Sequence, residues 1–398
     1  MSVSTPRWSE SASRLDDAAS RGLTPHGPGP ATGSRADVSR ETTPRHARVR
    51  PAHPGLYSAV PNAGGASSLD PLIGAGRSSG TPSPTVSAWT PIAEEAERAT
   101  RVKHPTDQLP RPSRRRVLAV ANQKGGVGKT TSTVNLAAGL ALQGLRTLVI
   151  DLDPQGNAST ALGIEHRSGT RSVYEVLLGE LELTDVVAVS PQSPNLLGVP
   201  ATIDLAGSEI ELVSMVARES RLRRALSSVA LDELGVDYIF IDCPPSLGLL
   251  TVNALVAAFE VLIPIQCEYY ALEGLGQLLR NIELVQAHLN PALSVSTILL
   301  TMYDGRTKLA DQVTAEVRNH FGDQVLRTVI PRSVKVSEAP GFGQTVLVYD
   351  PGSRGALSYV DAAREIALDR RYLNQGGPGD PAPGRPAAGP SSIREGNR

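Results

Sequence analysis

Cysteine is scarce in this chain, with two residues among 398. Both of them, Cys243 and Cys267, follow stretches that are typical of buried strands. Two thiols are too few for a disulfide framework, and an iron–sulfur cluster needs several thiolates. The scarcity therefore argues against a disulfide-stabilised secreted domain and favours a protein of the reducing cytoplasm.

Long apolar runs and aromatic residues are also few. No stretch is long and apolar enough to span a bilayer, and the N-terminal region has no apolar segment of the signal-peptide kind. Aromatic residues make up 4% of the chain, and both tryptophans, Trp8 and Trp89, precede residue 114. We therefore expect neither secretion nor membrane attachment.

Apolar periodicity is missing from both ends of the chain. Residues 1–113 are rich in Pro, Ser, Gly, Ala and Arg, and residues 374–398 are similar, so we expect two disordered tails around one α/β domain at 114–373. A short helix is predicted over 90–102, because Thr90 can cap it and Pro91 suits its first position. That helix is either transient or a docking segment for the core or a partner.

Charge of one sign prevails in each region although the net charge is only −1. Residues 1–116 hold 16 Lys and Arg against 10 Asp and Glu, while the remaining residues hold 23 against 30. An acidic core does not attract DNA as a whole, so DNA binding requires a local basic patch. The candidates follow two expected strands and are Arg306, Lys308, Arg332 and Lys335.

The most informative feature present is a glycine-rich run between an expected strand at 117–122 and a helical pattern at 131–142. This is the setting that a phosphate-binding loop requires. Glycines let backbone N–H groups approach phosphate oxygens, and the helix N-terminus adds partial positive charge. The run comprises Lys124, Gly125, Gly126, Val127, Gly128, Lys129, Thr130 and Thr131.

Two residues of this run have predicted roles in a Mg²⁺-dependent ATPase. Lys129 is expected to reach the β- and γ-phosphates of ATP, and Thr130 is expected to ligate Mg²⁺. The common fingerprint has glycine at the position of Gln123, and Lys124 stands beside it instead. The chain therefore carries an additional lysine at the start of its phosphate loop.

Carboxylates end two further β-branched stretches. Asp153 ends the stretch 147–153, and Asp242 ends the stretch 237–242. Acids at the carboxyl ends of parallel strands lie beside bound phosphates. Asp242 is therefore a candidate for holding a Mg²⁺-bound water, although a strand-end aspartate is often only a loop cap.

The order of elements predicts an α/β fold with a mostly parallel sheet and helices on both faces. Helical patterns cover 271–288 and 309–320, a charged helical stretch covers 209–224, and a last helix covers about 356–372. The expected strands are 117–122, 147–153, 237–242, 261–266, 295–302 and 325–330.

The run from Asn122 to Thr131 resembles the deviant Walker A motif of the ParA/MinD family of P-loop ATPases. In that family the lysine matching Lys124 crosses a dimer interface to the partner's nucleotide, and the aspartate matching Asp153 orients or deprotonates the attacking water. Segments such as 266–274 and 337–340 are similar to the chromosomal ParA, or Soj, branch. Positions matching Arg306 and Lys335 contribute to sequence-independent DNA binding in that branch.

The resemblance implies an ATP-dependent chromosome or plasmid partitioning protein, cytoplasmic and nucleoid-associated. Its ATP-bound homodimer would bind double-stranded DNA and be released when a ParB-like centromere-binding protein stimulates hydrolysis. Two alternatives stay open: a positioning ATPase for another cargo, and a MinD-like membrane-associated regulator. The second is disfavoured because the last helix has one apolar stripe that suits core packing, and the segment after it has no apolar face.

Overall fold

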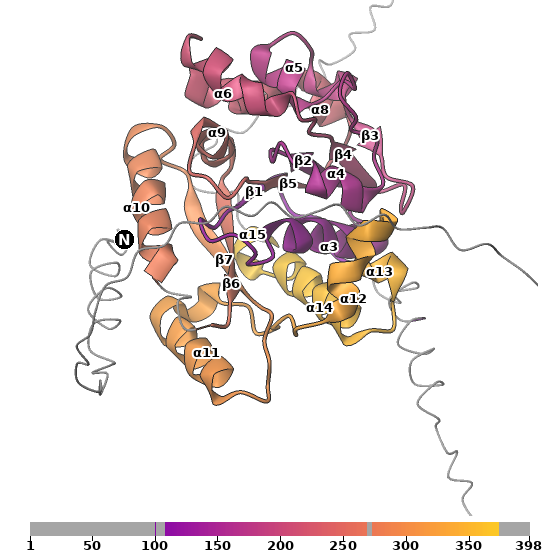
Figure 1. The fold of residues 1–398 in the computed structure, drawn as a ribbon, viewed down its shortest axis with the longest axis vertical. Helices are drawn as coiled ribbons and strands as arrows, with labels where there is room; N and C mark the ends of the chain where they lie inside the picture. Colours follow the sequence, from indigo (N-terminus) through magenta and orange to yellow (C-terminus); the bar gives the residue numbers. More distant parts are fainter. Residues whose placement is uncertain (1–99, 101–107, 269–272, 374–398) are drawn as a thin grey trace, which may run out of the picture. The chain divides into compact units, whose positions relative to one another are not determined.

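A computed structural model describes Thr100, residues 108–268 and residues 273–373. These residues form a seven-stranded sheet in the order β3-β4-β2-β5-β1-β6-β7, in which β3 alone runs antiparallel to its neighbour (Figure 1). The strands are β1 (Arg116–Val120), β2 (Thr147–Asp151), β3 (Ala188–Val189), β4 (Leu196–Val199), β5 (Tyr238–Asp242), β6 (Glu260–Gln266) and β7 (Ser294–Thr301). The mostly parallel α/β fold expected from the sequence is confirmed.

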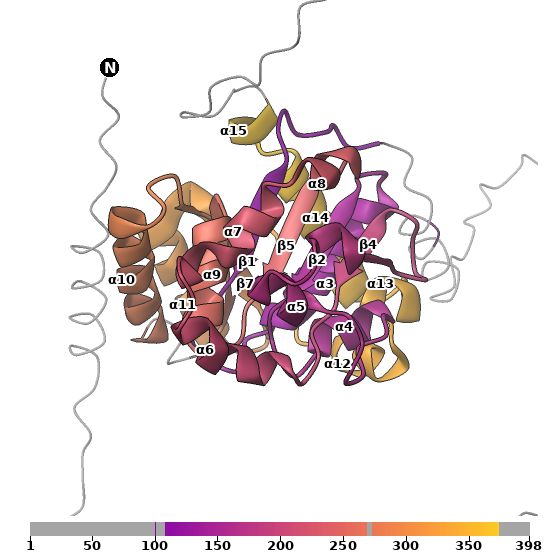
Figure 2. The ribbon, with the colours of Figure 1, turned by 90° about the horizontal axis from the view of Figure 1, so that it is seen from above.

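Helices cover both faces of the sheet (Figure 2). The α-helices are α3 (Lys129–Leu142), α4 (Asn157–Leu162), α5 (Val173–Leu178), α6 (Leu205–Val213), α7 (Arg221–Leu226), α8 (Val229–Glu233), α9 (Leu249–Ala257), α10 (Glu273–His288), α11 (Lys308–Phe321), α12 (Val334–Glu338), α13 (Val346–Tyr349), α14 (Arg354–Ala367) and α15 (Arg370–Leu373). Single turns of 3₁₀-helix are η1 (Leu183–Asp185), η2 (Arg218–Ser220), η3 (Gly322–Gln324) and η4 (Ala339–Phe342).

The apolar core consists of two clusters, one on each face of the sheet, and alternate residues of a strand belong to different clusters. Val117 and Ala119 of β1 belong to the apolar cluster that includes α5 to α11, whereas Leu118 and Val120 belong to the cluster that includes α3, α4 and α12 to α14. Successive side chains of a strand point to opposite faces, so a strand buried on both sides reads as a continuous apolar run. All five residues of β1 are buried.

Several expected elements differ from the structure. The segment 325–330 is not a strand: Val325 makes only an isolated bridge to Ile298. The amides of Leu326 and Ile330 donate to carbonyls of β7, but those of Arg327 and Thr328 between them donate to the carboxylate of Glu365 on α14. A side chain from another element therefore interrupts the backbone pairing that a strand would need. The short strands β3 and β4 were not expected, because neither stretch has a clear period of two.

Two expected helices are each divided into shorter pieces. The charged stretch 209–224 ends its first helix at Val213 and passes through Ala217, whose positive φ of 53° interrupts helical geometry before η2 and α7. The last helix stops at Ala367, and α15 begins three residues later. The predicted helix at 90–102 lies outside the described residues except for Thr100, which is helical.

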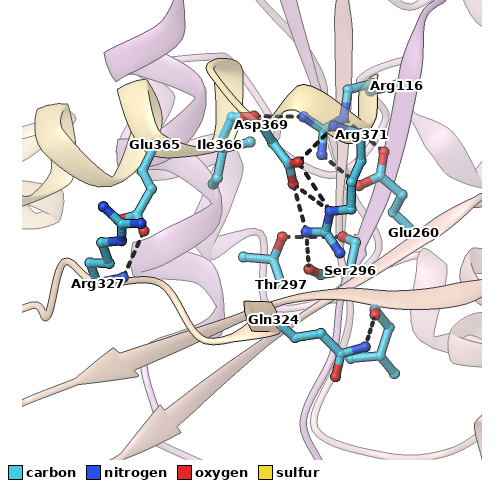
Figure 3. Close-up of polar contacts among 11 residues, drawn as sticks. Arg116, Glu260, Ser296, Thr297, Gln324, Arg327, Glu365, Ile366, Asp369 and Arg371 are labelled. Atoms are coloured by element: carbon cyan, nitrogen blue, oxygen red, sulfur yellow. Dashed lines mark hydrogen bonds and ion pairs between the residues drawn. The ribbon is translucent and has the colours of Figure 1, made fainter. Parts of the chain in front are cut away.

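The amino end of the sheet holds a buried ion pair that joins three elements. Arg116 of β1 and Glu260 of β6 are each 2% exposed, and the guanidinium makes two hydrogen bonds to the carboxylate, at 2.8 and 2.6 Å. Its third nitrogen donates to the carbonyl of Ile366 on α14 at 2.7 Å (Figure 3). The guanidinium also lies 3.8 Å from the ring centre of Tyr372. Burial alone would lower the pKa of Arg116, but Glu260 raises it above its ordinary value.

Residues before β1 also pack on this end of the domain. Leu109 is buried in the same apolar cluster as α3 and α14, and the amide of Ser113 donates to the carbonyl of Tyr372 at 3.4 Å. The first and last described parts of the domain are therefore neighbours. Among the described residues, no helix combines the length and the apolar character needed to cross a membrane.

Candidate nucleotide-binding site

The glycine-rich run forms the turn between β1 and α3, at the carboxyl end of the sheet. Gly126 and Gly128 have φ values of 73° and 87°, a region that other residues seldom adopt. A Cβ atom at Gly125 or Gly126 would meet nothing within 4 Å, so the loop's inner surface is open backbone. The carbonyl of the buried Val127 accepts a hydrogen bond from Thr301 at 2.8 Å, which holds the loop to β7.

Lys129 is the first residue of α3 and is 7% exposed. Its ammonium donates to the backbone carbonyl of Lys124 at 3.4 Å, so the side chain lies across the base of the loop. Burial lowers the pKa of Lys129, and the negative charges of Asp242 and Asp153 oppose that change. The arrangement places a partly desolvated cation where a phosphate group would replace a carbonyl oxygen as its partner.

Asp242 ends β5 and is completely buried. Its Oδ1 accepts a hydrogen bond from Thr133 at 3.0 Å, whereas its Oδ2 has no hydrogen-bond partner among the described residues. Burial raises the pKa of Asp242 to about 8, the neighbouring Asp151 adds to the rise, and the hydroxyls of Thr130 and Thr133 oppose it. A buried carboxylate oxygen without a partner fits a site for a hydrated cation.

Asp153 and its neighbour Asp151 continue this acidic cluster from β2. Asp151 is paired in register with Asp242, and its Oδ2 accepts hydrogen bonds from the amide and hydroxyl of Ser159 at 2.8 and 2.7 Å. The amide of Asp153 donates to Asp151 at 3.1 Å, so the buried residue positions the more exposed one. The carboxylate of Asp153 accepts a hydrogen bond from the amide of Gln155, and both residues lie in the loop between β2 and α4.

The sequence analysis did not identify Asp151 as a member of this acidic cluster. Burial raises its pKa to about 6, and the bonds from Ser159 oppose the rise. Its position two residues before Asp153, at the end of a β-branched stretch, was a signal that could have identified it. The structure brings Lys129, Asp151, Asp153 and Asp242 together at one end of the sheet.

Lys124 points away from the loop that it begins. Its backbone amide donates to Oδ1 of Asn122 at 3.0 Å, and the Asn122 amide group donates to the carbonyl of Pro264 in β6 at 2.7 Å. Its ammonium lies 3.6 Å from Oε2 of Glu268, and 34% of the side chain is exposed. The additional lysine therefore faces solvent rather than the interior of its own loop.

The basic residues considered for DNA binding lie in two segments that the fold brings together through an isolated bridge between Tyr303 and Pro331. Arg306 makes two hydrogen bonds to Asp304, at 2.9 and 2.7 Å, and Lys335 lies 3.4 Å from Glu338. The side chains of Arg306, Arg332 and Lys335 are exposed. Each forms an ion pair, with Asp304, Glu268 and Glu338 respectively. Lys308 begins α11 and is also exposed.

Comparison with known proteins adds family relationships to this geometry. A model of a family described as an AAA domain matches residues 115–295. The chain is 54% identical over 254 residues to the sporulation initiation inhibitor protein Soj of Bacillus subtilis, covering 64% of this chain and 99% of Soj. It is 52% identical over 256 residues to the chromosome partitioning protein ParA of Caulobacter vibrioides, covering 64% and 95%.

A solved structure agrees with these relationships. The cobyrinic acid a,c-diamide synthase of Mycobacterium smegmatis, solved with bound ADP and magnesium, is 40% identical and has a TM-score of 0.55. The match covers 65% of this chain and 98% of that protein. A relative with the same fold thus binds a nucleotide together with the metal that the unpartnered oxygen of Asp242 fits.

Proposed function

The chain belongs to the ParA/Soj family of chromosome-partitioning ATPases, and on that premise we propose that it moves DNA cargo by a cycle of ATP binding and hydrolysis. Two ATP-bound subunits close as a homodimer, and the dimer binds double-stranded DNA without sequence preference. A ParB-like centromere-binding protein stimulates hydrolysis and releases the subunits. The protein then acts in the cytoplasm, on the nucleoid.

The buried charge cluster at the carboxyl end of the sheet is the observation that carries this proposal. The loop from Gly125 to Thr131 surrounds the phosphates, and Lys129 exchanges its carbonyl partner for phosphate oxygens. Thr130 and the unpartnered oxygen of Asp242 would hold Mg²⁺ and its water, and the bound ion would supply positive charge next to the phosphates. Asp153 orients the attacking water or accepts its proton.

Lys124 has a different role from Lys129 because its side chain lies outside the pocket. Its ammonium is partly exposed and pairs with Glu268, so it contributes little to the site of its own subunit. We assign it to the nucleotide of the partner subunit, where it stabilises charge on the transferring phosphate. Closure of the dimer then completes each active site.

DNA binding is assigned to the surface that carries Arg306 and Lys335. The bridge between Tyr303 and Pro331 supports one continuous surface, because it joins the segments that bear these residues. Phosphate contacts of this kind position a protein on DNA without reading its sequence. The neighbouring residues Lys308 and Arg332 add positive charge to the electrostatic potential of the same surface.

Two lysine variants test the proposal directly. Lys129→Ala is expected to weaken ADP binding by about a hundredfold, because it removes a charge-assisted contact to phosphate. Lys124→Ala is expected to keep ADP affinity within about twofold and to lose ATP-dependent dimerisation and hydrolysis. Calorimetry with ADP and sedimentation with ATP separate the two. Equal losses of ADP affinity would show that Lys124 acts within its own subunit.

A further inference from the structure

Glu268 lies two residues beyond the end of β6, between the phosphate loop and the basic segment that includes Arg332 and Lys335. Its Oε2 is 3.6 Å from the ammonium of Lys124, and its Oε1 accepts a hydrogen bond from Arg332 at 3.2 Å. Gln266 also donates to Oε1. One carboxylate therefore contacts both the proposed trans-acting lysine and an arginine of the proposed DNA-binding surface.

Hydrogen bonds through Asn122 link the backbone segments that carry Lys124 and Glu268. Asn122 ties the amide of Lys124 to the carbonyl of Pro264 in β6, and β6 leads directly to Glu268. Lys124 and Glu268 thus lie just beyond the ends of two adjacent strands, β1 and β6. The side chains themselves are partly exposed, with 34% of Lys124, 46% of Glu268 and 60% of Arg332 accessible. Phosphate oxygens from outside the subunit can therefore reach either cation.

We propose that Glu268 restrains Lys124 and Arg332 within the separate subunit, and that it thereby sets the threshold for dimerisation and DNA binding together. The inference rests on the trans role proposed for Lys124. An ammonium that engages the partner's nucleotide exchanges the carboxylate of Glu268 for phosphate oxygens, so the two acceptors compete. DNA phosphates compete with the same carboxylate for Arg332.

The other pairs on this surface lack the link to the phosphate loop. Asp304 contacts Arg306, and Glu338 contacts Lys335, whereas neither acid forms an ion pair or hydrogen bond with the described loop residues 122–131. Loss of charge at Glu338 would free one basic residue, and loss of charge at Glu268 would free a basic residue and the trans-acting lysine. Glu338 therefore provides a matched comparison.

The magnitude follows from the exposure of the pair. Exposed ion pairs contribute modestly because water and salt screen them. Glu268→Gln keeps the shape of the side chain and removes its charge. We expect the protein concentration at half-maximal ATP-dependent dimerisation to fall about two- to fivefold in this variant at low salt.

The test measures dimerisation and DNA binding of the full chain as Glu268→Gln, Glu338→Gln and the parent. Sedimentation with a non-hydrolysable ATP analogue gives the dimerisation midpoint, and anisotropy with a labelled duplex gives DNA affinity without nucleotide. Both variants should raise nucleotide-free DNA affinity by up to about fivefold at low salt. Only Glu268→Gln should lower the dimerisation midpoint, and added salt should remove the difference.

Lys124→Ala distinguishes failure of the inference from failure of the proposed function. If Lys124→Ala dimerises with ATP as the parent does, the trans role is wrong. The ion pair with Glu268 would then have no effect on dimerisation to explain. If Lys124→Ala fails to dimerise while Glu268→Gln matches or weakens the parental midpoint, the restraint alone is overturned. A lower midpoint in Glu338→Gln equal to that in Glu268→Gln would also overturn it, because general surface charge would then explain both.

Discussion

Buried charges occur at both ends of the central sheet, and the two groups differ in how fully they are neutralised. At the amino end, Arg116 and Glu260 satisfy one another, and the remaining guanidinium nitrogen reaches a backbone carbonyl. At the carboxyl end, Lys129 lies near Asp242 and Asp153, and one oxygen of Asp242 has no partner among the described residues. The first group is neutralised within the protein, whereas the second has an acceptor oxygen that a ligand would complete.

This difference suggests separate roles for the two groups, one in stability and one in ligand binding. A buried charge without its partner costs free energy, so the cluster at the carboxyl end destabilises the ligand-free protein. The elements that meet at the amino end, namely β1, β6 and the C-terminal end of α14, are joined by a group that lies at the opposite end of the sheet from the phosphate loop. Variants at the two ends should therefore change stability and activity independently.

Asp153→Ala should give the largest change, and it should be a change in activity. Removing the group that orients the attacking water should lower the ATP hydrolysis rate by about 10²- to 10⁴-fold while ATP-dependent dimers persist on DNA. Thermal unfolding should stay near that of the parent because Asp153 is partly exposed. A parental hydrolysis rate would remove Asp153 from the mechanism.

Glu260→Gln should give the largest change in stability. Breaking a buried ion pair leaves Arg116 charged and poorly compensated, at a cost of about 3–5 kcal/mol in unfolding free energy. Denaturant unfolding of the variant and the parent measures this loss of unfolding free energy. The double variant Arg116→Met with Glu260→Leu should recover most of the loss, since it leaves no buried charge. ADP affinity per folded molecule should be unchanged in both, and a large loss of affinity would contradict the separation of the two ends.

Asp242→Asn should change stability in the opposite direction. Replacing a buried carboxylate that faces Asp151 by a neutral amide should raise the unfolding free energy of the nucleotide-free protein by about 1 kcal/mol. The increase in melting temperature on adding ADP and Mg²⁺ should become much smaller. A variant that is less stable than the parent without ligand would show that the carboxyl end is already well neutralised.

Arg306→Ala and Lys335→Ala should give the smallest changes, since both residues lie outside the two buried groups. Each should flatten the plot of log DNA affinity against log salt concentration by about 0.9 per lost phosphate contact. Hydrolysis without DNA should be unaffected. Unchanged slopes in both variants would return these residues to ordinary surface charge.

The sequence predicted the phosphate loop and its flanking elements because all the determining signals are local. The glycines, the buried strand before them and the helix after them lie within about thirty residues of chain. The resemblance to the ParA/Soj branch was confirmed by the relatives of 54% and 52% identity. Signals of this kind need no knowledge of what lies nearby in space.

What could not be predicted depends on contacts between distant segments. The hydrogen bonds that the amides of Arg327 and Thr328 donate to Glu365 join residues nearly forty positions apart, and they interrupt the strand that the apolar pattern suggested. The pairing of Asp151 with Asp242 depends on the register of β2 and β5. The position of Glu268 between two cations likewise appears only when β6 lies beside the phosphate loop.

The contact between Ser113 and Tyr372 has a consequence for how the chain can be tethered. Both residues lie at the amino end of the sheet, opposite the phosphate loop. A bulky group attached to the domain near either residue would therefore lie away from the nucleotide-binding end and would not obstruct it.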